Sequence, residues 1–277
     1  MSHLTPNPAP KSGHKFNTQQ WRSLGQTGLL VSPLGLGTVK LGRNTGVKYP
    51  QAFDLPDDAQ VETLLSTAKD CGINLIDTAP AYGISEQRLG HLLPGPRTDW
   101  VICTKVGETF YNQQSRYDFT REATRASLAQ SLRLLGTDYL DIVLVHCPDE
   151  DLHCLQHTDV LAELARWQQR GHIRAIGAST KTVAAGLFAL DVADIAMVTF
   201  NPADQSQLPV MAHAQALGKN VLLKKVLASG HLMASAPETA ETNPIALALD
   251  QPSVASAIIG TTDPGHLKDN VRDAISP

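Results

Sequence analysis

The sequence predicts an α/β protein, a (β/α)8 TIM barrel that follows a short N-terminal hairpin. Eight short apolar runs occur along the 277 residues, and a segment with helical periodicity follows each one. Apolar and polar residues do not alternate within these runs, which is typical of parallel strands buried on both faces. Eight such units in a chain of this length indicate a closed barrel rather than an open sheet.

No linker-like stretch divides the units, so we expect one barrel domain over residues 21–277, preceded by a mobile tail over residues 1–20. A turn between apolar flanks predicts the hairpin over Trp21–Val31. The expected strands are Ser32–Gly37, Ile73–Asp77, Trp100–Lys105, Leu140–His146, Ile173–Ala178, Ile195–Thr199, Val221–Lys225 and Ser256–Ile259. The expected helices begin at Pro56 and then cover Ser85–Leu93, Thr120–Leu135, Thr158–Arg170, Lys181–Leu190, Leu208–Leu217, Ile245–Leu249 and Pro264–Ala274.

The composition excludes several classes of function. A net charge of -4 and a pI near 6.2 give no electrostatic reason to bind nucleic acid or an anionic membrane. The spacing of the four cysteines does not indicate a disulfide framework, and the polar N-terminus has no apolar core of a secretory signal. We therefore expect a cytoplasmic protein that is a monomer or a weak homo-oligomer.

Reactive side chains stand at the ends of three consecutive expected strands. Asp77 ends one strand and Tyr82 lies on the loop after it, Lys105 ends the next strand, and His146 ends the third. Active sites of barrels lie at the C-terminal ends of the strands, so these four side chains can converge. Taken singly, each has an ordinary explanation, such as a helix cap for Asp77, a solvated lysine for Lys105 and a structural role for His146.

The motifs around these residues resemble those of a known family. The segment DTAPAYG at residues 77–83, the pair TK at 104–105 and the pair VH at 145–146 are similar to the aldo-keto reductases. The later stretches KKVLASGHL and IIGTTDPGHLKDN are similar to a small bacterial branch of that family. The resemblance extends from about Trp21 to Ala274 and implies an NADP(H)-dependent reductase of carbonyl compounds, or an alcohol dehydrogenase in reverse, with NAD(H) as the alternative cofactor.

The four residues account physically for such a reaction. Hydride transfer to a carbonyl carbon leaves charge on the oxygen, and Tyr82 can give that oxygen a proton. An ordinary tyrosine titrates near ~10, so a cation at Lys105 is expected to lower the pKa of Tyr82. Asp77 would pair with Lys105, and His146 would hydrogen-bond the substrate oxygen and stabilise the developing alkoxide.

The resemblance also implies a set of cofactor-binding residues. Gly37 and Thr38 would lie beside the nicotinamide, Ser179 would hold its carboxamide, and Asn270 would reach the adenine. Lys225, Leu227 and Ser229 match the pyrophosphate loop of the family. The segment Gly35–Lys40 lacks the last glycine of a dinucleotide fingerprint, so we do not expect a Rossmann domain.

This sequence departs from the family pattern at several cofactor positions. Thr180 replaces the usual Asn, Met197 the usual Gln, and Lys224 the aromatic residue that stacks on nicotinamide. Gly260 and His266 stand where a Lys and an Arg commonly clasp the 2′-phosphate of NADP. The nearby residues that remain as phosphate partners are Thr261, Thr262 and Lys268.

Two alternative functions stay open at this stage. One is a non-catalytic NADP(H)-binding regulatory or sensor subunit, and another is a barrel aldolase with Lys105 as a Schiff base.

The segment from His146 to His157 is rich in metal ligands but lacks a second cluster at zinc-finger spacing, so we expect a solvated loop and no metal. The expected loop Gly107–Phe119 contains Phe110, Tyr111 and Tyr117, which could wall the substrate pocket or simply pack on the surface.

Overall fold

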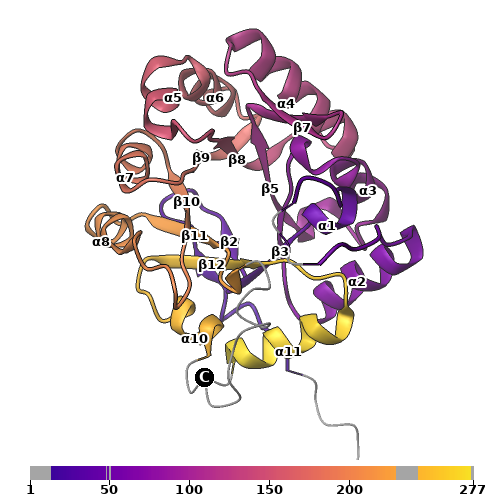
Figure 1. Ribbon diagram of the computed structural model, residues 1–277. Coiled ribbons are helices and arrows are strands. Elements are labelled where there is room, and N and C mark those ends of the chain that lie inside the picture. Colours follow the sequence, from indigo (N-terminus) through magenta and orange to yellow (C-terminus); the bar gives the residue numbers. More distant parts are fainter. Residues whose placement is uncertain (1–13, 48, 50, 229–242, 276–277) are drawn as a thin grey trace, which may run out of the picture.

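Eight parallel strands form a closed barrel in the computed structural model, which describes residues 14–47, 49, 51–228 and 243–275 (Figure 1). Around the barrel the strands follow the order β3, β4, β5, β8, β9, β10, β11 and β12, and β12 pairs with β3 to close it. The predicted fold class is thus confirmed. The strand bounds are β3 Leu34–Gly37, β4 Leu75–Asp77, β5 Val101–Val106, β8 Leu140–His146, β9 Ile173–Ser179, β10 Ile195–Thr199, β11 Asn220–Lys224 and β12 Val254–Ile259.

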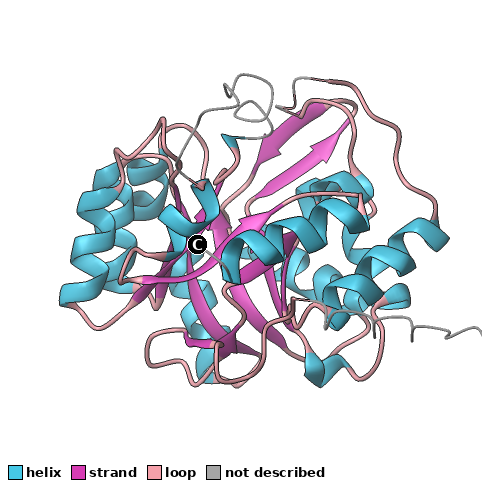
Figure 2. Ribbon diagram, turned by 90° about the horizontal axis from the view of Figure 1, so that it is seen from below, coloured by secondary structure: helices cyan, strands magenta, loops and turns pink. Residues whose placement is uncertain are grey.

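Helices surround the strands, as the side view in Figure 2 shows. Several begin and end at the residues that favour these positions: Asp57 forms a capping box with Gln60, and Gly136 ends a helix in the left-handed conformation. In the described part of the chain, no helix is both long and apolar enough to cross a membrane. The helices are α2 Asp58–Asp70, α3 Ser85–Leu92, α4 Arg121–Leu135, α6 Val160–Gln169, α7 Val183–Val192, α8 Leu208–Ala216, α10 Pro244–Leu249 and α11 Pro264–Ile275.

The hydrophobic core has two parts. The larger part lies between the strands and the surrounding helices, and the smaller part fills the inside of the barrel. The predicted hairpin, β1 Arg22–Ser23 paired with β2 Leu30–Val31, contributes Leu24, Leu29 and Val31 to the inner part. The hairpin therefore covers one end of the barrel and leaves the opposite end for chemistry.

Two expected loops contain regular structure. Residues 106–119 include an antiparallel hairpin, β6 Glu108–Tyr111 with β7 Gln114–Tyr117, instead of a loop. Its two turn residues, Asn112 and Gln113, both have positive φ (49° and 61°), as a type I′ turn requires. The sequence did not reveal this turn because glutamine rather than glycine occupies its second position.

The segment predicted as a solvated loop is also partly helical, since α5 covers Asp151–His157. Asp151 is 1% exposed, and its carboxylate accepts hydrogen bonds from the backbone N–H groups of Lys181 and Thr182 and from the Thr182 hydroxyl. Cys147 and Cys154 are buried. Within the described residues, no three His, Cys, Asp or Glu side chains come together as a metal site requires. Asp151 thus links the first residue of α5 to the residues just before α7.

The fold begins before Trp21. Phe16 is only 4% exposed, and its backbone N–H donates to the carbonyl of Cys71 (2.9 Å). The indole N–H of Trp21 donates to the neighbouring carbonyl of Gly72 (3.2 Å). Phe16, which we expected to belong to a mobile tail, therefore contacts the end of α2, whereas residues 1–13 lie outside the described residues.

Replacement of Phe16 by alanine tests whether this segment stabilises the barrel. Phe16→Ala should lower the free energy of unfolding by about 3 kcal/mol, because it leaves a cavity where a buried ring was. Urea unfolding measures the change, and Gln19→Ala, at an exposed position, is the matched control. A loss no larger than that of the control would show that the segment adds nothing to stability.

Candidate active site

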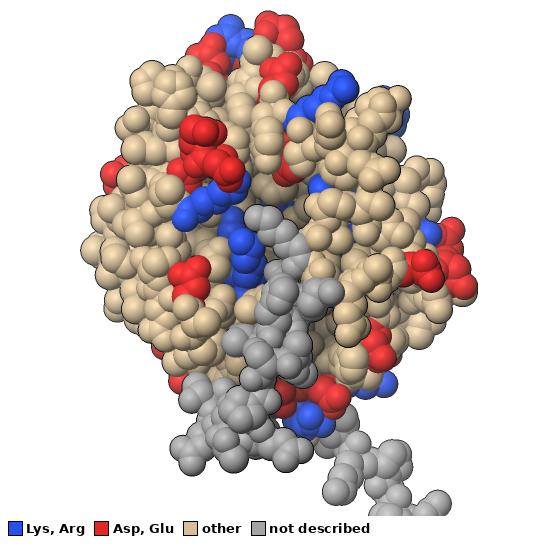
Figure 3. Space-filling model, viewed as in Figure 1, with Lys and Arg blue, Asp and Glu red and all other residues tan. Residues whose placement is uncertain are grey.

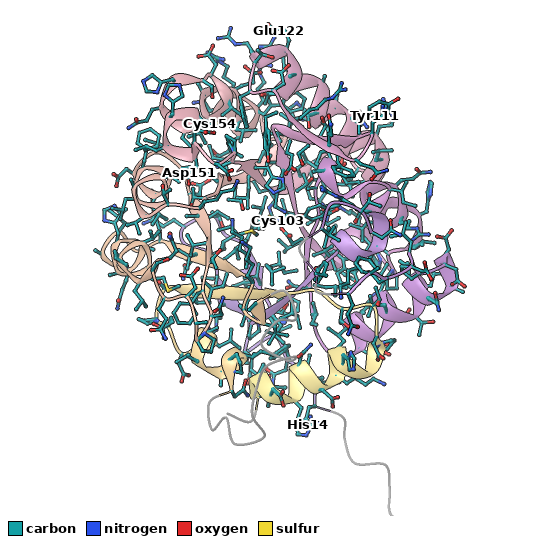
Figure 4. All side chains as sticks on the ribbon, viewed as in Figure 1. His14, Cys103, Tyr111, Glu122, Asp151 and Cys154 are labelled. Carbon is teal, nitrogen blue, oxygen red and sulfur yellow. The ribbon has the colours of Figure 1, made fainter. Side chains whose placement is uncertain are left out.

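The predicted catalytic residues point into the barrel because side chains alternate along its strands. Leu75, Cys103 and Leu144 belong to the inner core cluster, and the residues two positions further on are Asp77, Lys105 and His146. Figure 4 shows Cys103 near the centre of the ring. The same alternation turns Ser179 and Lys224 inward, since Ala175 on β9 and Leu222 on β11 lie in the inner cluster. The top layer of the barrel interior is therefore polar.

Asp77 and Lys105 form a buried ion pair. The Nζ of Lys105 lies 2.6 Å from Oδ1 of Asp77 and donates a second hydrogen bond to the carbonyl of Thr78 (2.8 Å). Only 1% of the Lys105 side chain is exposed. Burial is the largest single influence and would lower the pKa of Lys105, but the charge and hydrogen bond of Asp77, together with Tyr82 and Cys103, outweigh it and raise that pKa. Lys105 is therefore an ammonium ion at any ordinary pH.

Tyr82 lies next to this pair on a short 3-10 helix, η1 Pro80–Tyr82. Its ring centroid is 4.9 Å from Nζ of Lys105 and 6.1 Å from the centroid of the His146 ring. A close backbone contact fixes this turn: a Cβ on Gly42 would lie 2.2 Å from the carbonyl oxygen of Tyr82, so the site requires glycine. Gly42 ends the short helix α1 Val39–Gly42, inside a segment predicted as loop.

The pKa of Tyr82 shifts in the direction opposite to our expectation. Lys105 does favour the phenolate, but burial is the larger effect and raises the pKa of Tyr82 above its ordinary value. The sequence could not reveal this outcome, because the degree of burial depends on the surrounding fold. In this structure Tyr82 is therefore a phenol and a hydrogen-bond donor.

Sequence analysis missed one charged residue of the site. Glu108, the first residue of β6, places Oε2 of its carboxylate 2.8 Å from Nδ1 of His146. The hydroxyl of Ser115, on β7, donates to Oε1 (2.6 Å), and Arg43 lies 4.0 Å from the same oxygen. Glu108 was hidden because its segment was predicted as a loop and its partner, His146, is distant in sequence.

The opposite wall of the barrel mouth is positively charged. Lys224, at the end of β11, donates hydrogen bonds to the Ser179 hydroxyl and to the carbonyl of Thr180, both at 2.8 Å. Burial and the neighbouring lysines lower the pKa of Lys224 to about 7. Figure 3 shows lysine and arginine side chains gathered in the central hollow of this face. The Thr180 hydroxyl oxygen is buried there without a hydrogen-bond partner among the described residues.

The other expected cofactor residues lie around the same end of the barrel. Thr38 is buried after Gly37, and its backbone N–H and its hydroxyl both donate to the carbonyl of Asp77 (2.9 Å each). Lys225 begins a turn with positive φ (58°), and Asn201 donates to its carbonyl (3.1 Å). Leu227 is half-buried in this turn, and Ser229 lies outside the described residues.

The residues after β12 line a groove of about 620 Å³ between the N-terminal ends of α2 and α11. Thr262 lines it, together with the acidic residues Asp54, Asp57 and Asp263, and no lysine or arginine is among its lining residues. Gly260 and Thr261 precede the groove. The remaining expected residues lie on α11, where His266 and Lys268 are exposed and Asn270 is half-buried.

Comparison with known proteins identifies the family. The model of the aldo/keto reductase family matches residues 33–245. The chain belongs to the aldo/keto reductase family. A solved structure from Pseudomonas aeruginosa, assigned to the aldo-keto reductases, is 49% identical and superposes with a TM-score of 0.83, covering 94% of this chain and 96% of that one. Members of this family are oxidoreductases that use nicotinamide cofactors on small carbonyl compounds.

Two relatives with named activities are more distant. L-galactose dehydrogenase of Arabidopsis thaliana is 30% identical over 230 residues, which are 78% of this chain and 68% of that protein. The NADH-specific methylglyoxal reductase of Escherichia coli is 34% identical over 169 residues, which are 56% of this chain and 50% of that protein. The chain therefore spans only about half the length of the second relative.

The buried ion pair between Asp77 and Lys105 gives a testable difference in stability between two kinds of substitution. Asp77→Ala leaves the Lys105 ammonium buried without its counter-ion and should lower the free energy of unfolding by about 3–5 kcal/mol. Joint replacement by Asp77→Leu and Lys105→Met removes both charges and should cost less than the single change. Chemical unfolding measures both variants.

The exposed pair Lys69–Asp99, also in contact at 2.9 Å, provides the control for this experiment. Its side chains are 39% and 45% exposed, so Asp99→Ala should cost less than about 1 kcal/mol. Equal costs for Asp77→Ala and Asp99→Ala would contradict the strong coupling that we assign to the buried pair.

Proposed function

We propose that this protein is an NAD(P)(H)-dependent oxidoreductase that interconverts a small carbonyl compound and its alcohol, with Tyr82 as the general acid and base. The convergence of Asp77, Tyr82, Lys105 and His146 in the top layer of the barrel is the observation that supports it. Because all four of these residues are present and close together, they favour a catalytically active enzyme over a non-catalytic regulatory subunit. The Asp77 carboxylate beside Lys105 keeps that amine protonated, which disfavours the Schiff-base alternative.

Each residue has a distinct task in the proposed reaction. Bound nicotinamide would supply or accept the hydride. Tyr82, held as a phenol, donates to the substrate oxygen and gives up its proton as negative charge grows there. Lys105 stabilises the phenolate that remains, and Asp77 keeps Lys105 charged and fixed. The His146 ring contacts the same substrate oxygen from the other side of the mouth.

The residues at the barrel rim fit the nicotinamide end of such a cofactor. The Thr180 hydroxyl is buried without a partner, a costly state that a ligand amide would relieve. Ser179 still has its own hydroxyl hydrogen to donate, because it accepts from Lys224. Residues 225–229, Gly37 and the segment from Gly260 to Asn270 would bind the remainder of the cofactor.

The acidic groove supports NAD(H) over NADP(H). Its carboxylates at Asp54, Asp57 and Asp263 would repel a 2′-phosphate, whereas a carboxylate favours the free 2′-hydroxyl of NAD. The relative in Escherichia coli is named as NADH-specific, which agrees with this assignment. We also propose a cytoplasmic location, since all four cysteines are free thiols.

The substrate that we propose is a small aldehyde, ketone or sugar. The relatives named above act on methylglyoxal and L-galactose, which are the first two compounds to assay. On the β6–β7 hairpin, the Phe110 ring lies 3.3 Å from the Arg43 guanidinium carbon, while Tyr111 is 63% exposed. Phe110 is therefore the hairpin aromatic that we expect to wall the pocket.

Tyr82→Phe tests the proposed proton donor. It should reduce turnover of methylglyoxal or L-galactose by a factor of about 10²–10⁴, the usual contribution of a positioned acid or base. Cofactor affinity should hardly change, because only the hydroxyl is lost. Tyr111→Phe, on the exposed hairpin, should leave both quantities unchanged. A Tyr82→Phe variant that keeps full turnover would refute the role of Tyr82.

Fluorescence titration with NADH and with NADPH tests the cofactor preference. We expect NADH to bind at least about tenfold more tightly, which corresponds to roughly 1.4 kcal/mol. Asp54→Asn should tighten NADPH binding a few-fold by removing one repulsive charge, while Asp70→Asn at the other end of α2 should not. Tighter binding of NADPH by the unmodified protein would overturn the preference, and binding of neither would overturn the proposed function.

A further inference from the structure

Two lysines lie in the top layer of the barrel interior, and their hydrogen-bond partners differ. Nζ of Lys105 lies 2.6 Å from a carboxylate oxygen of Asp77. Nζ of Lys224 donates instead to the hydroxyl of Ser179 and to the carbonyl of Thr180, both at 2.8 Å, and neither of these acceptors is charged. Among the residues that the structure describes, no carboxylate forms an ion pair with Lys224. Lys224 therefore lacks the anion that keeps Lys105 protonated.

The two acceptors around Lys224 match a neutral amine. An ammonium ion has three N–H groups, whereas a neutral amine has two N–H groups and one lone pair. The hydroxyl of Ser179 and the carbonyl of Thr180 accept the two N–H groups of the neutral form, and its lone pair then points away from both. Lys224 is half-buried at the barrel mouth, where a ligand can approach that lone pair. The geometry is thus that of a nucleophilic amine.

Neighbouring charges also favour the neutral form of Lys224. Burial is the largest influence on its pKa and lowers it, and the positive charges of Lys225, Lys105 and Lys181 act in the same direction. The resulting pKa of Lys224 is about 7, so about half of this side chain is a neutral amine at pH 7. Lys181 itself pairs with the exposed carboxylate of Asp149 (2.6 Å).

The remaining titratable groups that face Lys224 come from β8 and the residue after it. Burial lowers the pKa of His146, so its ring is uncharged near pH 7. Cys147 would favour the charged form of Lys224 only as a thiolate, and burial raises the pKa of this thiol above its ordinary value. Neither group therefore supplies the negative charge that would hold Lys224 as an ammonium ion at neutral pH.

We propose that the amine of Lys224 is a second reactive group of the barrel mouth, which forms a reversible imine with aldehydes and prefers aldehydes that also carry a negative charge. The positive charges of Lys105, Lys181 and Lys225 would attract such an anion. Lysine and arginine side chains gather in the central hollow of this face (Figure 3). This reaction goes beyond the proposed function and does not depend on it, because no cofactor takes part.

The proposed reaction needs neither an oxidant nor a reductant. The lone pair of Nζ attacks the carbonyl carbon of the aldehyde, and one proton moves from the nitrogen to the carbonyl oxygen, which gives a carbinolamine. The hydroxyl of the carbinolamine takes a proton from the solvent and leaves as water. The product is a protonated imine with one N–H group, which can still donate to the carbonyl of Thr180.

Reductive trapping with cyanoborohydride detects the imine in the full-length protein without cofactor. The anionic probe is para-formylbenzoate, N-acetyl-lysine amide in the same solution is the reference amine, and peptide mass spectrometry locates the adduct. An ordinary lysine titrates near ~10.4, so at pH 7 less than about 0.1% of the reference is neutral. We expect Lys224 to be labelled at least about tenfold faster than the reference, and Lys224→Met to remove this adduct. Labelling no faster than the reference would overturn the inference.

The pH dependence of labelling has a definite sign. The neutral fraction of Lys224 rises with pH and levels off above its pKa of about 7, whereas that of the reference still increases. The ratio of labelling at Lys224 to labelling of the reference should therefore fall about tenfold from pH 6 to pH 8. The ratio also cancels the pH dependence of the reductant. A constant ratio would show that Lys224 titrates like an ordinary lysine and would overturn the inference.

Ser179→Asp tests whether the missing carboxylate is the cause. It would place an anion beside Nζ of Lys224, as Asp77 lies beside Lys105, and should lower labelling at pH 7 at least about fivefold. Ser179→Asn has nearly the same size without the charge and is the matched control, which should retain most of the labelling. Equal labelling in the two variants would contradict the inference. If Ser179→Asp does not fold, the pH dependence of the unmodified protein still decides it.

The uncharged analogue para-formylbenzamide tests the preference for anionic aldehydes. After division by the rate of the reference amine, para-formylbenzoate should label Lys224 at least about threefold faster than the amide at low salt. The difference should disappear near about 1 M salt, which screens charges beyond about 3 Å. Equal normalised rates at low salt would overturn the preference for a negative charge.

Discussion

The ion pair between Asp77 and Lys105 is the constraint on which the rest of the site depends. Two opposite charges inside a barrel lose their hydration, and a 2.6 Å contact with one further acceptor at Thr78 must offset that loss. Hydrogen bonds at the C-terminal ends of the strands hold the backbone on either side of this ion pair. Thr38 donates twice to the Asp77 carbonyl, and the Thr78 N–H donates to the carbonyl of Cys103 on the next strand. The ladder of strands thus fixes the separation of the charges.

Alternation along parallel strands explains how much of this site the sequence could predict. Every second residue of β4, β5 and β8 points inward, and the last inward position of each strand carries a polar group instead of an aliphatic one. The bounds of β8 and β10 agree with the prediction residue for residue, because short runs rich in β-branched residues between turn signals favour strands over helices. The convergence of Asp77, Lys105 and His146 follows from the same pattern.

The features that the sequence did not predict all depend on contacts between distant segments. The β6–β7 hairpin has Gln113 at the turn position that usually contains glycine, so its turn lacked the usual local signature. Glu108 becomes part of the site only because this hairpin folds over the barrel mouth. The raised pKa of Tyr82 likewise reflects burial, which no local motif encodes. Residue types therefore predicted which groups meet, but not their protonation.

Two buried carboxylates, Asp77 and Glu108, each contact one of the other polar groups of the barrel mouth. Asp77 keeps Lys105 charged and Glu108 lies beside His146, while Tyr82 lies between the two pairs. Arg43 offsets the charge of Glu108 as Lys105 offsets that of Asp77, so neither carboxylate is an uncompensated buried charge. Lys224, whose pKa is about 7, adds positive charge on the opposite wall that varies around neutral pH. The proton affinity of this site is thus set by its neighbours' charges and by burial, and a change in any one of these residues alters the protonation of the others.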